Sequence, residues 1–323
     1  MSVVNSGTRP SLSPGQRPGS PRKRQRGPRL DITLAGQSKL APYLFSAPAI
    51  VTVSLLLAYP VLYGLYNSLF RAPSLGAPEE FVGLENYSDM FADPAFWHAL
   101  VRSAVFVFGC LILGLILGLF FAFALNRVIR QLRFLRAITI APYIISNVAA
   151  AVMFRLVFNS DFGLLNRTIE FFGFDGPGWL SNGTLAMVVV IFCQVWTDLP
   201  LTILLLLAGL QTIDTSYLDA ARVDGATGWK RAWHLSIPLI SPQIVISTVW
   251  LSYSTLTGLG VVLALTGGGP LKATQTLPME MYSTAFTDLE MNEALAIASF
   301  ILILNALLTL VYVTVARRYG TVE

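Results

Sequence analysis

The carboxylate of Asp198 lies deep within an apolar stretch, in the string Gln194-Val195-Trp196-Thr197-Asp198-Leu199-Pro200. An ionisable side chain at that depth marks a candidate functional site, because apolar surroundings solvate charge poorly. Pro200 lacks a backbone N–H and is expected to break the helix two residues later. Three interpretations stay open for this carboxylate: a place on a substrate path, a hydrogen-bonded structural role near a re-entrant bend, or coupling to a proton or sodium ion.

Hydroxyl and amide side chains interrupt two further apolar stretches. One contains Tyr143, Ser146 and Asn147, and the other is rich in hydroxyl groups from Ser252 to Thr257. Polar groups inside apolar helices need a purpose or a partner, although some hydroxyls only bond to the carbonyl one turn back. The pattern favours a wet lining that holds a solute by hydrogen bonds.

The sequence lacks the residue patterns of a membrane-embedded enzyme. Such enzymes need paired carboxylates, a Ser–Lys dyad or HExxH, and the lone Asp198 cannot replace them. Glycines 267–269 are not directly followed by the Lys and the Ser or Thr that complete a phosphate cradle. Cys110 and Cys193 have neither CxxC spacing nor a nearby His, so we expect them to be packing residues. We predict no catalytic residue and no metal site.

A short polar island, residues 217–242, separates two long apolar stretches. One of residues 214–216 is expected to cap a helix that runs through Val223, and Ser216 and Asp219 have capping-box spacing. Gly225 should end this helix, with Asp224 in the turn, because a carboxylate is unfavourable at a helix C-terminus. A second helix should start at Thr227.

This predicted helix is too short to cross a bilayer, since ten residues extend only about 15 Å. Ala220, Ala221 and Ala226 leave it a slim surface. The island therefore reads as an element that docks into a groove of another protein.

The elements that position these residues are membrane spans. The chain is 54% hydrophobic and 12% charged over 323 residues, with a mean hydropathy of +0.63, which soluble domains of this length do not show. We predict an all-α polytopic protein with six transmembrane helices in one domain, residues 41–323, after a disordered basic arm, residues 1–40. The predicted spans are 42–69, 98–125, 135–158, 184–208, 238–265 and 293–316.

The distribution of Lys and Arg predicts the orientation. With the N-terminus inside, 17 of the 22 basic residues fall on the cytoplasmic side, as the positive-inside rule requires. Both termini and the polar island are then cytoplasmic. The net charge of +4 reflects this topology, and no nucleic-acid partner is predicted. The arm has two open interpretations: a solvated segment that fixes topology, or weak attraction to anionic lipid.

Several strings resemble those of known permeases. Asp219-Ala220-Ala221, then Asp224-Gly225-Ala226 and Ile237-Pro238, resemble the EAA loop of permease subunits of type I ABC importers, in which Glu is usual at the first position. Residues 81–87, FVGLENY, resemble a string in the first periplasmic loop of carbohydrate permeases, and residues 265–270, LTGGGP, resemble their outer turn. The chain is similar to the MalF/UgpA-type carbohydrate permeases from about residue 42 to residue 318.

The resemblance implies a subunit of an ATP-driven sugar importer in the bacterial plasma membrane. Its expected partners are a second, MalG-like permease subunit, two ATP-binding cassette ATPases and an extracytoplasmic sugar-binding protein or lipoprotein. No Walker A string occurs, so ATP and Mg²⁺ belong to the ATPases, and this chain needs no cofactor. The coupling loop spans about residues 213–240, and its expected ATPase-coupling residues are Asp219, Ala220, Ala221, Asp224, Gly225, Ala226 and Pro238.

The resemblance also implies a substrate path. The positions that contact sugar in the maltose permease of this family fall on Tyr143, Asn147, Gln194, Thr197, Asp198, Leu251, Thr255 and Gly258. Leu251 and Gly258 depart from the polar residues usual there. One aromatic ring and several neutral hydrogen-bonding groups fit a polyhydroxyl solute, such as a disaccharide. A phosphate ester would call for Arg or Lys, and neither occurs at these positions.

Two other transport functions stay open. A proton- or ion-coupled secondary sugar transporter would work without any ATPase. An importer of the same class could instead carry a glycerophosphodiester or glycerol phosphate.

Overall fold

The computed structural model describes residues 41–72, 80–128, 139, 141–226 and 228–319. The arm predicted for residues 1–40 lies outside them. The chain divides into two compact units, Met1–Leu55 and Leu56–Glu323. The first contains helix α1 (Ala41–Val53), and a π-helical segment, η1 (Ser54–Ala58), crosses the division. All contacts described below lie within the second unit.

Among its described residues, the regular structure of the second unit is helical apart from one short hairpin, which confirms the all-α expectation. Strands β1 (Phe70–Arg71) and β2 (Glu80–Phe81) pair antiparallel, with Phe70 opposite Phe81. The helical segments are α2 (Tyr59–Asn67), α3 (Glu85–Ala92), α4 (Pro94–Val128), α6 (Asn147–Val157), α7 (Leu164–Phe171), α8 (Gly183–Thr212), α9 (Thr215–Val223), α10 (Gly228–Arg231), η2 (Ala232–Ser236), α11 (Ile237–Leu239), α12 (Ser241–Thr257), α13 (Gly260–Leu265), α14 (Leu277–Phe286) and α15 (Met291–Tyr319).

Among the described residues, four helices are long and apolar enough to cross a membrane: Phe45–Asn67, Pro94–Asn126, Gly183–Thr212 and Met291–Val315. A fifth span results if Gly228–Leu239 and Ser241–Thr257, which meet at a 74° bend, count as one. The predicted third span, 135–158, is described only in part, and its helix α6 has 11 residues. The six-span count is therefore not confirmed.

Side chains fix where two long helices begin. Asp93 Oδ1 accepts a hydrogen bond from Ala95 N at 2.8 Å, beside Pro94 at the start of α4. Asn182 Oδ1 accepts from the backbone N–H groups of Thr184 and Leu185 at 3.0 and 3.2 Å at the start of α8. Both are N-caps of the type that Asp and Asn favour, since the first turn has free N–H groups.

Helices α4, α8 and α12 pack on one another, and α15 packs on α12. Close approach depends on glycines in α4, the segment whose Gly114 and Gly118 have GxxxG spacing. A Cβ at Gly118 would lie 2.8 Å from Thr202 Cγ2 of α8, and one at Gly114 would lie 3.1 Å from Leu251 Cδ1 of α12. Small residues let helix backbones meet without a hydrophobic driving force in lipid.

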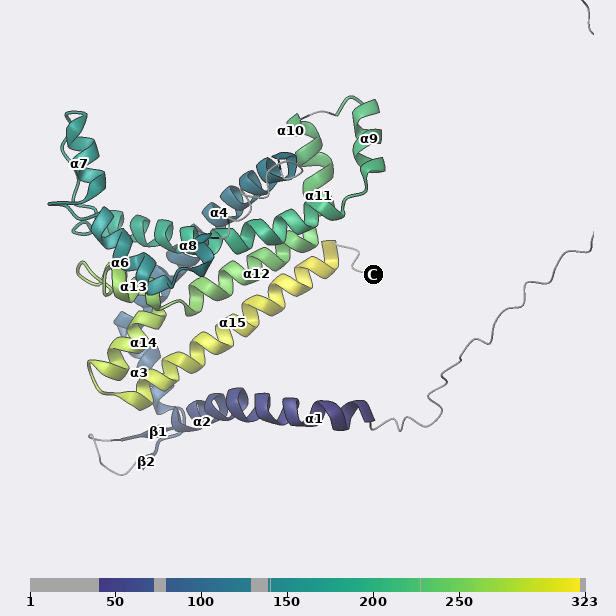
Figure 1. The fold of residues 1–323 in the computed structure, drawn as a ribbon. Coiled ribbons are helices and arrows are strands. Elements are labelled where there is room, and N and C mark those ends of the chain that lie inside the picture. Colours follow the sequence, from purple (N-terminus) through teal and green to yellow (C-terminus); the bar gives the residue numbers. More distant parts are fainter. Residues whose placement is uncertain (1–40, 73–79, 129–138, 140, 227, 320–323) are drawn as a thin grey trace, which may run out of the picture. The chain divides into compact units, whose positions relative to one another are not determined.

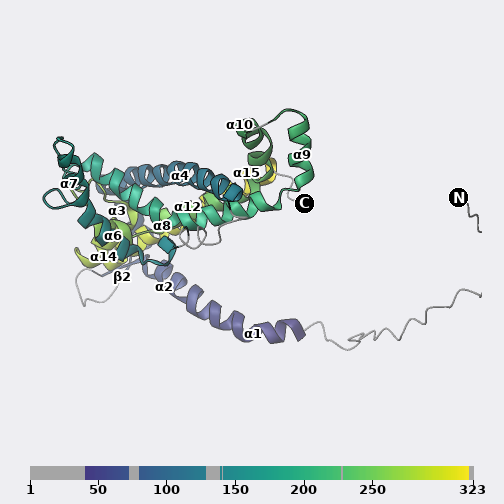
Figure 2. The ribbon, with the colours of Figure 1, turned by 45° about the horizontal axis from the view of Figure 1, so that its top comes forward.

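Figures 1 and 2 show the polar elements at opposite ends of these long helices. Helices α9 and α10 lie at one end, where α15 also terminates, and α7 and α14 lie at the other. The polar island and the last described residues of α15 therefore lie at the same end of these helices.

Pro200 does not break the helix as predicted, because α8 is continuous from Gly183 to Thr212. Residues on both sides of Pro200 are buried, and α8 packs against α4 and α12. This tertiary packing outweighs the loss of one backbone hydrogen bond, as neighbouring helices do for prolines within membranes.

Two residues of the FVGLENY string, Asn86 and Tyr87, hydrogen-bond to the residues that follow α2. Buried Asn86 donates from Nδ2 to the carbonyls of Ser68 and Phe70 at 2.8 and 2.7 Å, and it accepts from Arg71 Nε at 3.1 Å. The Tyr87 hydroxyl lies 2.7 Å from Ser68 Oγ. Asn86 and Tyr87 thus hold α3 against the chain that leaves α2.

Candidate functional site

Asp198 sits at the contact between α8 and α12, and its side chain is 4% exposed. Gln194 Nε2, one turn earlier on α8, donates to Asp198 Oδ2 at 2.8 Å. The Ser254 hydroxyl of α12 lies 3.0 Å from each carboxylate oxygen, and Gln194 Nε2 lies 3.4 Å from Ser254 Oγ. We call Gln194, Asp198 and Ser254, of which Ser254 is half-buried, the buried triad. Its donors stabilise the carboxylate where water is excluded.

The buried triad lies next to a break in the predicted fifth span. Helix α12 ends at Thr257 and α13 begins at Gly260, so residues 258 and 259 leave the helix. A Cβ at Gly258 would lie 2.6 Å from Ser254 O and 3.7 Å from Gln194 Oε1. Irregular backbone at membrane depth is tolerated where protein covers it or where it lines a watery cavity. A side chain at Gly258 would therefore clash with the carbonyl of Ser254, whereas Gln194 lies at an ordinary contact distance from the break.

Asn147 begins the helix that faces the other side of the break. A Cβ at Gly260 would lie 3.8 Å from Asn147 Cβ and 3.5 Å from Val148 Cγ2. Helices α6 and α13 pack together beyond this point. Asn147 of α6 and Gln194 of α8 therefore both lie close to residues 258–260.

The eight residues expected on the substrate path do not form one surface in this chain. Tyr143 is 46% exposed and Asn147 is exposed, whereas Gln194, Thr197 and Asp198 are buried. The chain brings Gln194, Asp198 and Gly258 together. Their role in transport stays a prediction.

Three of the path candidates, Thr197, Leu251 and Thr255, are buried and contact their own helix or the apolar core. Leu251 is fully buried and packs in the apolar cluster that includes residues of α4 and α15. Thr255 Oγ1 donates to Leu251 O at 2.7 Å, and Thr197 Oγ1 donates to Gln194 O at 2.8 Å. Both hydroxyls bond to a carbonyl in the preceding turn of their own helix. This is the alternative to a solute contact that the sequence left open for such hydroxyls.

Ser254 is the functional candidate that sequence reasoning missed. It was only one of several hydroxyl residues between 252 and 257, and the sequence does not say which of them faces α8. The spacing of the residues could have pointed to Ser254. Gln194 and Asp198 are four residues apart, and Ser254 is four residues before Gly258, another residue expected on the substrate path. Residues at that spacing share a helix face.

The polar island contains the predicted short helix, α9. Its N-cap is Asp214, whose Oδ1 accepts from Ser216 N at 2.9 Å. Hydrogen bonds from the backbone and side chain of Ser216 hold the pKa of the exposed Asp214 carboxyl below its usual value. The capping box expected from Ser216 and Asp219 does not form. Asp219 Oδ1 instead accepts from Arg222 Nη1 at 2.7 Å.

The end of α9 confirms the role expected for Gly225. Gly225 N donates to Arg222 O at 3.1 Å and Ala226 N donates to Ala221 O at 2.9 Å, with Gly225 at a φ of +76°. This is the Schellman arrangement, which needs a left-handed residue where glycine carries no steric cost. Asp224 lies in the turn as predicted. Thr227, the predicted second start, lies outside the described residues, and α10 begins at Gly228.

Helix α9 has almost no packing partner among the residues that the structure describes. None of its nine residues, all of them described, is buried, and Val223 is 88% exposed. Among the expected coupling residues, Asp219, Ala220, Asp224, Gly225 and Pro238 are exposed, and Ala221 and Ala226 are half-buried. The helix is thus capped at both ends while its sides are exposed, and its role in docking stays a prediction.

Comparison with known proteins identifies the family. Residues 114–321 match the family described as "Binding-protein-dependent transport system inner membrane component". The chain is 32% identical over 278 residues to the sn-glycerol-3-phosphate transport system permease protein UgpA of Agrobacterium fabrum, covering 84% of this chain and 93% of that protein. UgpA of Salmonella typhimurium is 34% identical over 291 residues, covering 88% and 97%.

A relative from Bacillus subtilis, "Probable ABC transporter permease protein YurN", is 32% identical over 288 residues, covering 86% of this chain and 96% of that protein. In fold, the chain is similar to a subunit of a bacterial ABC transporter involved in the import of the acidic polysaccharide alginate. The TM-score is 0.75 at 19% identity, with 87% of this chain and 96% of that chain covered. The chain belongs to the family of binding-protein-dependent transport system inner membrane components, and it has their type I ABC importer permease fold.

Proposed function

We propose that this chain forms half of the translocation path of an ATP-driven importer for an uncharged sugar or related polyhydroxyl solute. As a member of its family, the chain is a multi-pass inner-membrane permease of an ABC importer for sugar-related solutes. The proposal adds the charge class of the solute, the residues that meet it and the way in which transport is driven.

The observation that carries the proposal is the position of the buried triad beside the break at residues 258 and 259. The residues near this break, Asn147, Gln194 and Ser254, carry neutral donors and acceptors. Asp198 is the one charged group, and donors from this chain already contact both of its oxygens. Hydroxyl groups of a sugar bind well to such neutral groups, whereas a phosphate favours Arg or Lys.

The second half of the path comes from a second permease subunit. Tyr143 and Asn147, exposed in this chain, then face the shared cavity, and the Tyr143 ring stacks on a sugar face. An extracytoplasmic sugar-binding protein delivers the solute. The solved alginate transporter lends support, since one of its structures is in complex with an alginate-bound periplasmic protein.

Transport is powered by two ATPase subunits, which bind ATP and Mg²⁺. Helix α9 of this chain docks into a groove of one of them. Residues 213–240 lie on the cytoplasmic side in this proposal. Closure of the ATPases on ATP draws the loops of the two permeases together and opens the cavity to the outside, and hydrolysis resets it. The unpacked sides of α9 and its capped ends support this role.

Glycerol phosphate is the second candidate solute, and the names of the relatives favour it. Several relatives that are 32–34% identical are sn-glycerol-3-phosphate permeases. The neutral groups at the expected path positions argue against a doubly charged ester in this chain.

Uptake into proteoliposomes tests the proposal. The chain is reconstituted with the permease, ATPase and binding protein encoded beside it, and labelled maltose or sn-glycerol 3-phosphate is supplied with ATP in the ATPase compartment. We expect uptake of maltose that needs ATP and ignores a pH gradient. Uptake of glycerol 3-phosphate alone would overturn the uncharged class, and uptake driven by a pH gradient without ATPases would overturn the ATP-driven mechanism.

A cysteine crosslink tests the docking helix separately. Ala221→Cys should crosslink to an ATPase subunit through a reagent added from the cytoplasmic side. Modification of this cysteine only from outside would show that the orientation is wrong.

A further inference from the structure

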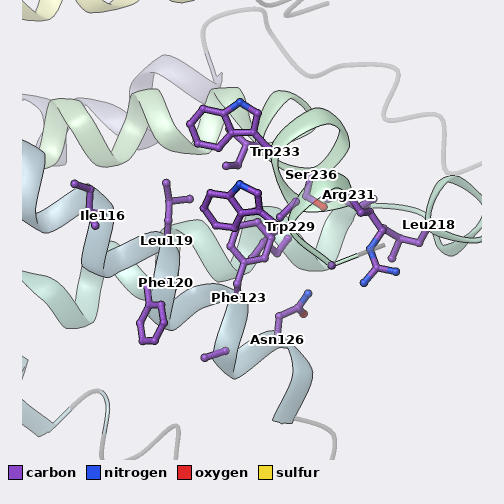
Figure 3. A pocket seen from close by; sticks show the side chains of 16 residues that line it. Ile116, Leu119, Phe120, Phe123, Asn126, Leu218, Trp229, Arg231, Trp233 and Ser236 are labelled. Atoms are coloured by element: carbon purple, nitrogen blue, oxygen red, sulfur yellow. The ribbon is translucent and has the colours of Figure 1, made fainter. Parts of the chain in front are cut away.

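A pocket of about 640 Å³ lies between the end of α4 and the segment that follows α9. Figure 3 shows the rings of Phe120, Phe123, Trp229 and Trp233 around it, with Arg231 and Asn126 at its polar end. A volume of this size is within the range of about 300–1,000 Å³ that small-molecule sites occupy. The substrate path uses none of these residues.

The lining changes from apolar to polar along α4. Ile116 and Phe120 lie within the candidate span Pro94–Asn126, are 60% and 65% exposed, and face the pocket. Asn126 is the last residue of that span. These positions cover ten residues of helix, or about 15 Å, which is half the thickness of a bilayer's hydrocarbon core. The pocket thus runs from hydrocarbon depth to the membrane surface.

Trp229 and Trp233 mark the surface end of the pocket. Their rings stack with centroids 5.8 Å apart, and they are 75% and 56% exposed. Trp is enriched at the level of the lipid headgroups, because its ring is apolar while its N–H seeks a polar partner.

The charge at this end is positive and unpaired. Arg231 is the one charged residue in the lining, and no carboxylate of the described residues forms an ion pair with it. In the sequence, four arginines at 127, 130, 133 and 136 follow the end of the span. Clusters of this kind next to a membrane helix attract anionic lipids of the cytoplasmic leaflet.

We propose that this pocket binds an anionic glycerophospholipid, with an acyl chain along Ile116 and Phe120 and the phosphate at Arg231 and the two tryptophans. The inference rests on the cytoplasmic orientation in the proposed function. An occupant from residues 129–138 of this chain would bring three arginines and no acid beside Arg231, which is unfavourable. An amphiphile of opposite charge matches both ends of the pocket.

Photocrosslinking in the assembled complex identifies the occupant. The complex is placed in nanodiscs of phosphatidylglycerol and phosphatidylcholine, with benzoylphenylalanine at Phe120 or at Phe121. Both positions are exposed on α4, and Phe121 is outside the pocket lining. We expect crosslinks at Phe120 to be enriched in phosphatidylglycerol over the bulk ratio, and crosslinks at Phe121 to follow that ratio. Equal ratios, or crosslinks from Phe120 to the second permease or to residues 129–138, would overturn the proposal.

Native mass spectrometry of the complex gives a second, probe-free measurement. Arg231→Gln should lower the retention of phosphatidylglycerol about fivefold, the effect of one basic residue near a membrane surface. Lys230→Gln removes an adjacent cation that does not line the pocket, and it should change retention less than twofold. Equal losses in both variants would show that only general surface charge acts. Neither measurement depends on uptake. The proposed lipid site can therefore be refuted without refuting the proposed solute, and the proposed solute without refuting the lipid site.

Discussion

Two carboxylates of this chain, Asp198 and Asp219, have opposite surroundings. Asp198 is buried between α8 and α12, and its partners Gln194 and Ser254 belong to the same chain. Asp219 lies on α9, is exposed, and has one ion pair with a described residue, Arg222 of its own helix. An exposed pair of this kind contributes little to stability, so the conformation around Asp219 is not what holds the fold.

The difference indicates where each region has its partners. In the α4–α8–α12 core, changes that disturb packing should alter the stability of this chain itself. In α9, changes should leave the chain intact and alter its work with other subunits. Four predictions test this division, in order of decreasing effect.

The largest effect is expected at the turn after α9. Gly225→Asp should reduce uptake more than tenfold while the protein still accumulates in the membrane. The substitution forces a side chain into a left-handed residue, at a cost of about 1–2 kcal/mol, and places a charge beside the docking helix. Uptake and membrane content are measured together.

Gly173→Asp provides the matched control. Gly173 also has a positive φ, +85°, and no described atom lies within 4 Å of a Cβ added at either glycine. The backbone cost is therefore similar, but Gly173 follows α7 at the other end of the long helices. Normal uptake in the Gly225 variant, or equal losses in both, would break the division between docking helix and core.

The second effect concerns core packing. Gly118→Leu should lower the free energy of unfolding by about 1–3 kcal/mol, because the side chain would overpack against Thr202 and Leu206. Ala104→Leu adds a similar side chain at an exposed position of the same helix and should have little effect. Thermal unfolding in detergent measures both, and equal stability of the two variants would contradict the packing of α4 on α8.

The third effect concerns the buried triad. Asp198→Asn should change substrate affinity or transport rate severalfold and leave the assembly of the complex intact, because an amide can still hydrogen-bond with Ser254 and Gln194. Uptake kinetics and copurification of the partner subunits are the measurements. A variant that fails to accumulate or loses its partners would favour the structural interpretation of Asp198.

The smallest effect is expected at the N-cap of α9. Asp214→Ala should speed amide hydrogen exchange in the first turn of α9 severalfold, and Asp214→Asn should preserve the cap. Since the pKa of Asp214 is lowered in the folded chain, its stabilisation is present above the unfolded pKa of about 3.9. It is lost as pH falls through the folded value, where wild-type exchange should approach that of the alanine variant. Unchanged exchange in Asp214→Ala would refute the cap.

Local patterns predicted much of the fold and of the island. Runs of about 20 apolar residues indicated the long helices, and Gly225 indicated a left-handed turn because its type and place after α9 leave few alternatives. These features depend on residues close together in the sequence, so the sequence alone carries the information.

Features that depend on contacts between helices were less predictable. The sequence favoured a break at Pro200, yet neighbouring helices keep α8 continuous, and the observed break lies at Gly258, which carries no such local signal. Ser254 was not distinguished from Thr255, because the rotation of α12 about its axis is set by packing on α4 and α8. The capping box was wrong because Asp214 is the N-cap, which places Ser216 inside the first turn of α9.

The segments Gly228–Leu239 and Ser241–Thr257 meet at a 74° bend, so together they form a bent arm with its corner before α12. Ile240, at the corner, is fully buried against Ala122 and Leu206. This packing holds the corner in place, so the arm would pivot about Ile240. The arm Gly228–Leu239 has 12 residues and extends about 18 Å, so a tilt of about 10° at the corner moves its far end by roughly 3 Å. We propose that a sideways pull on this arm by a docked ATPase would rotate α12, and with it the break at residues 258 and 259, without a change in the length of either helix.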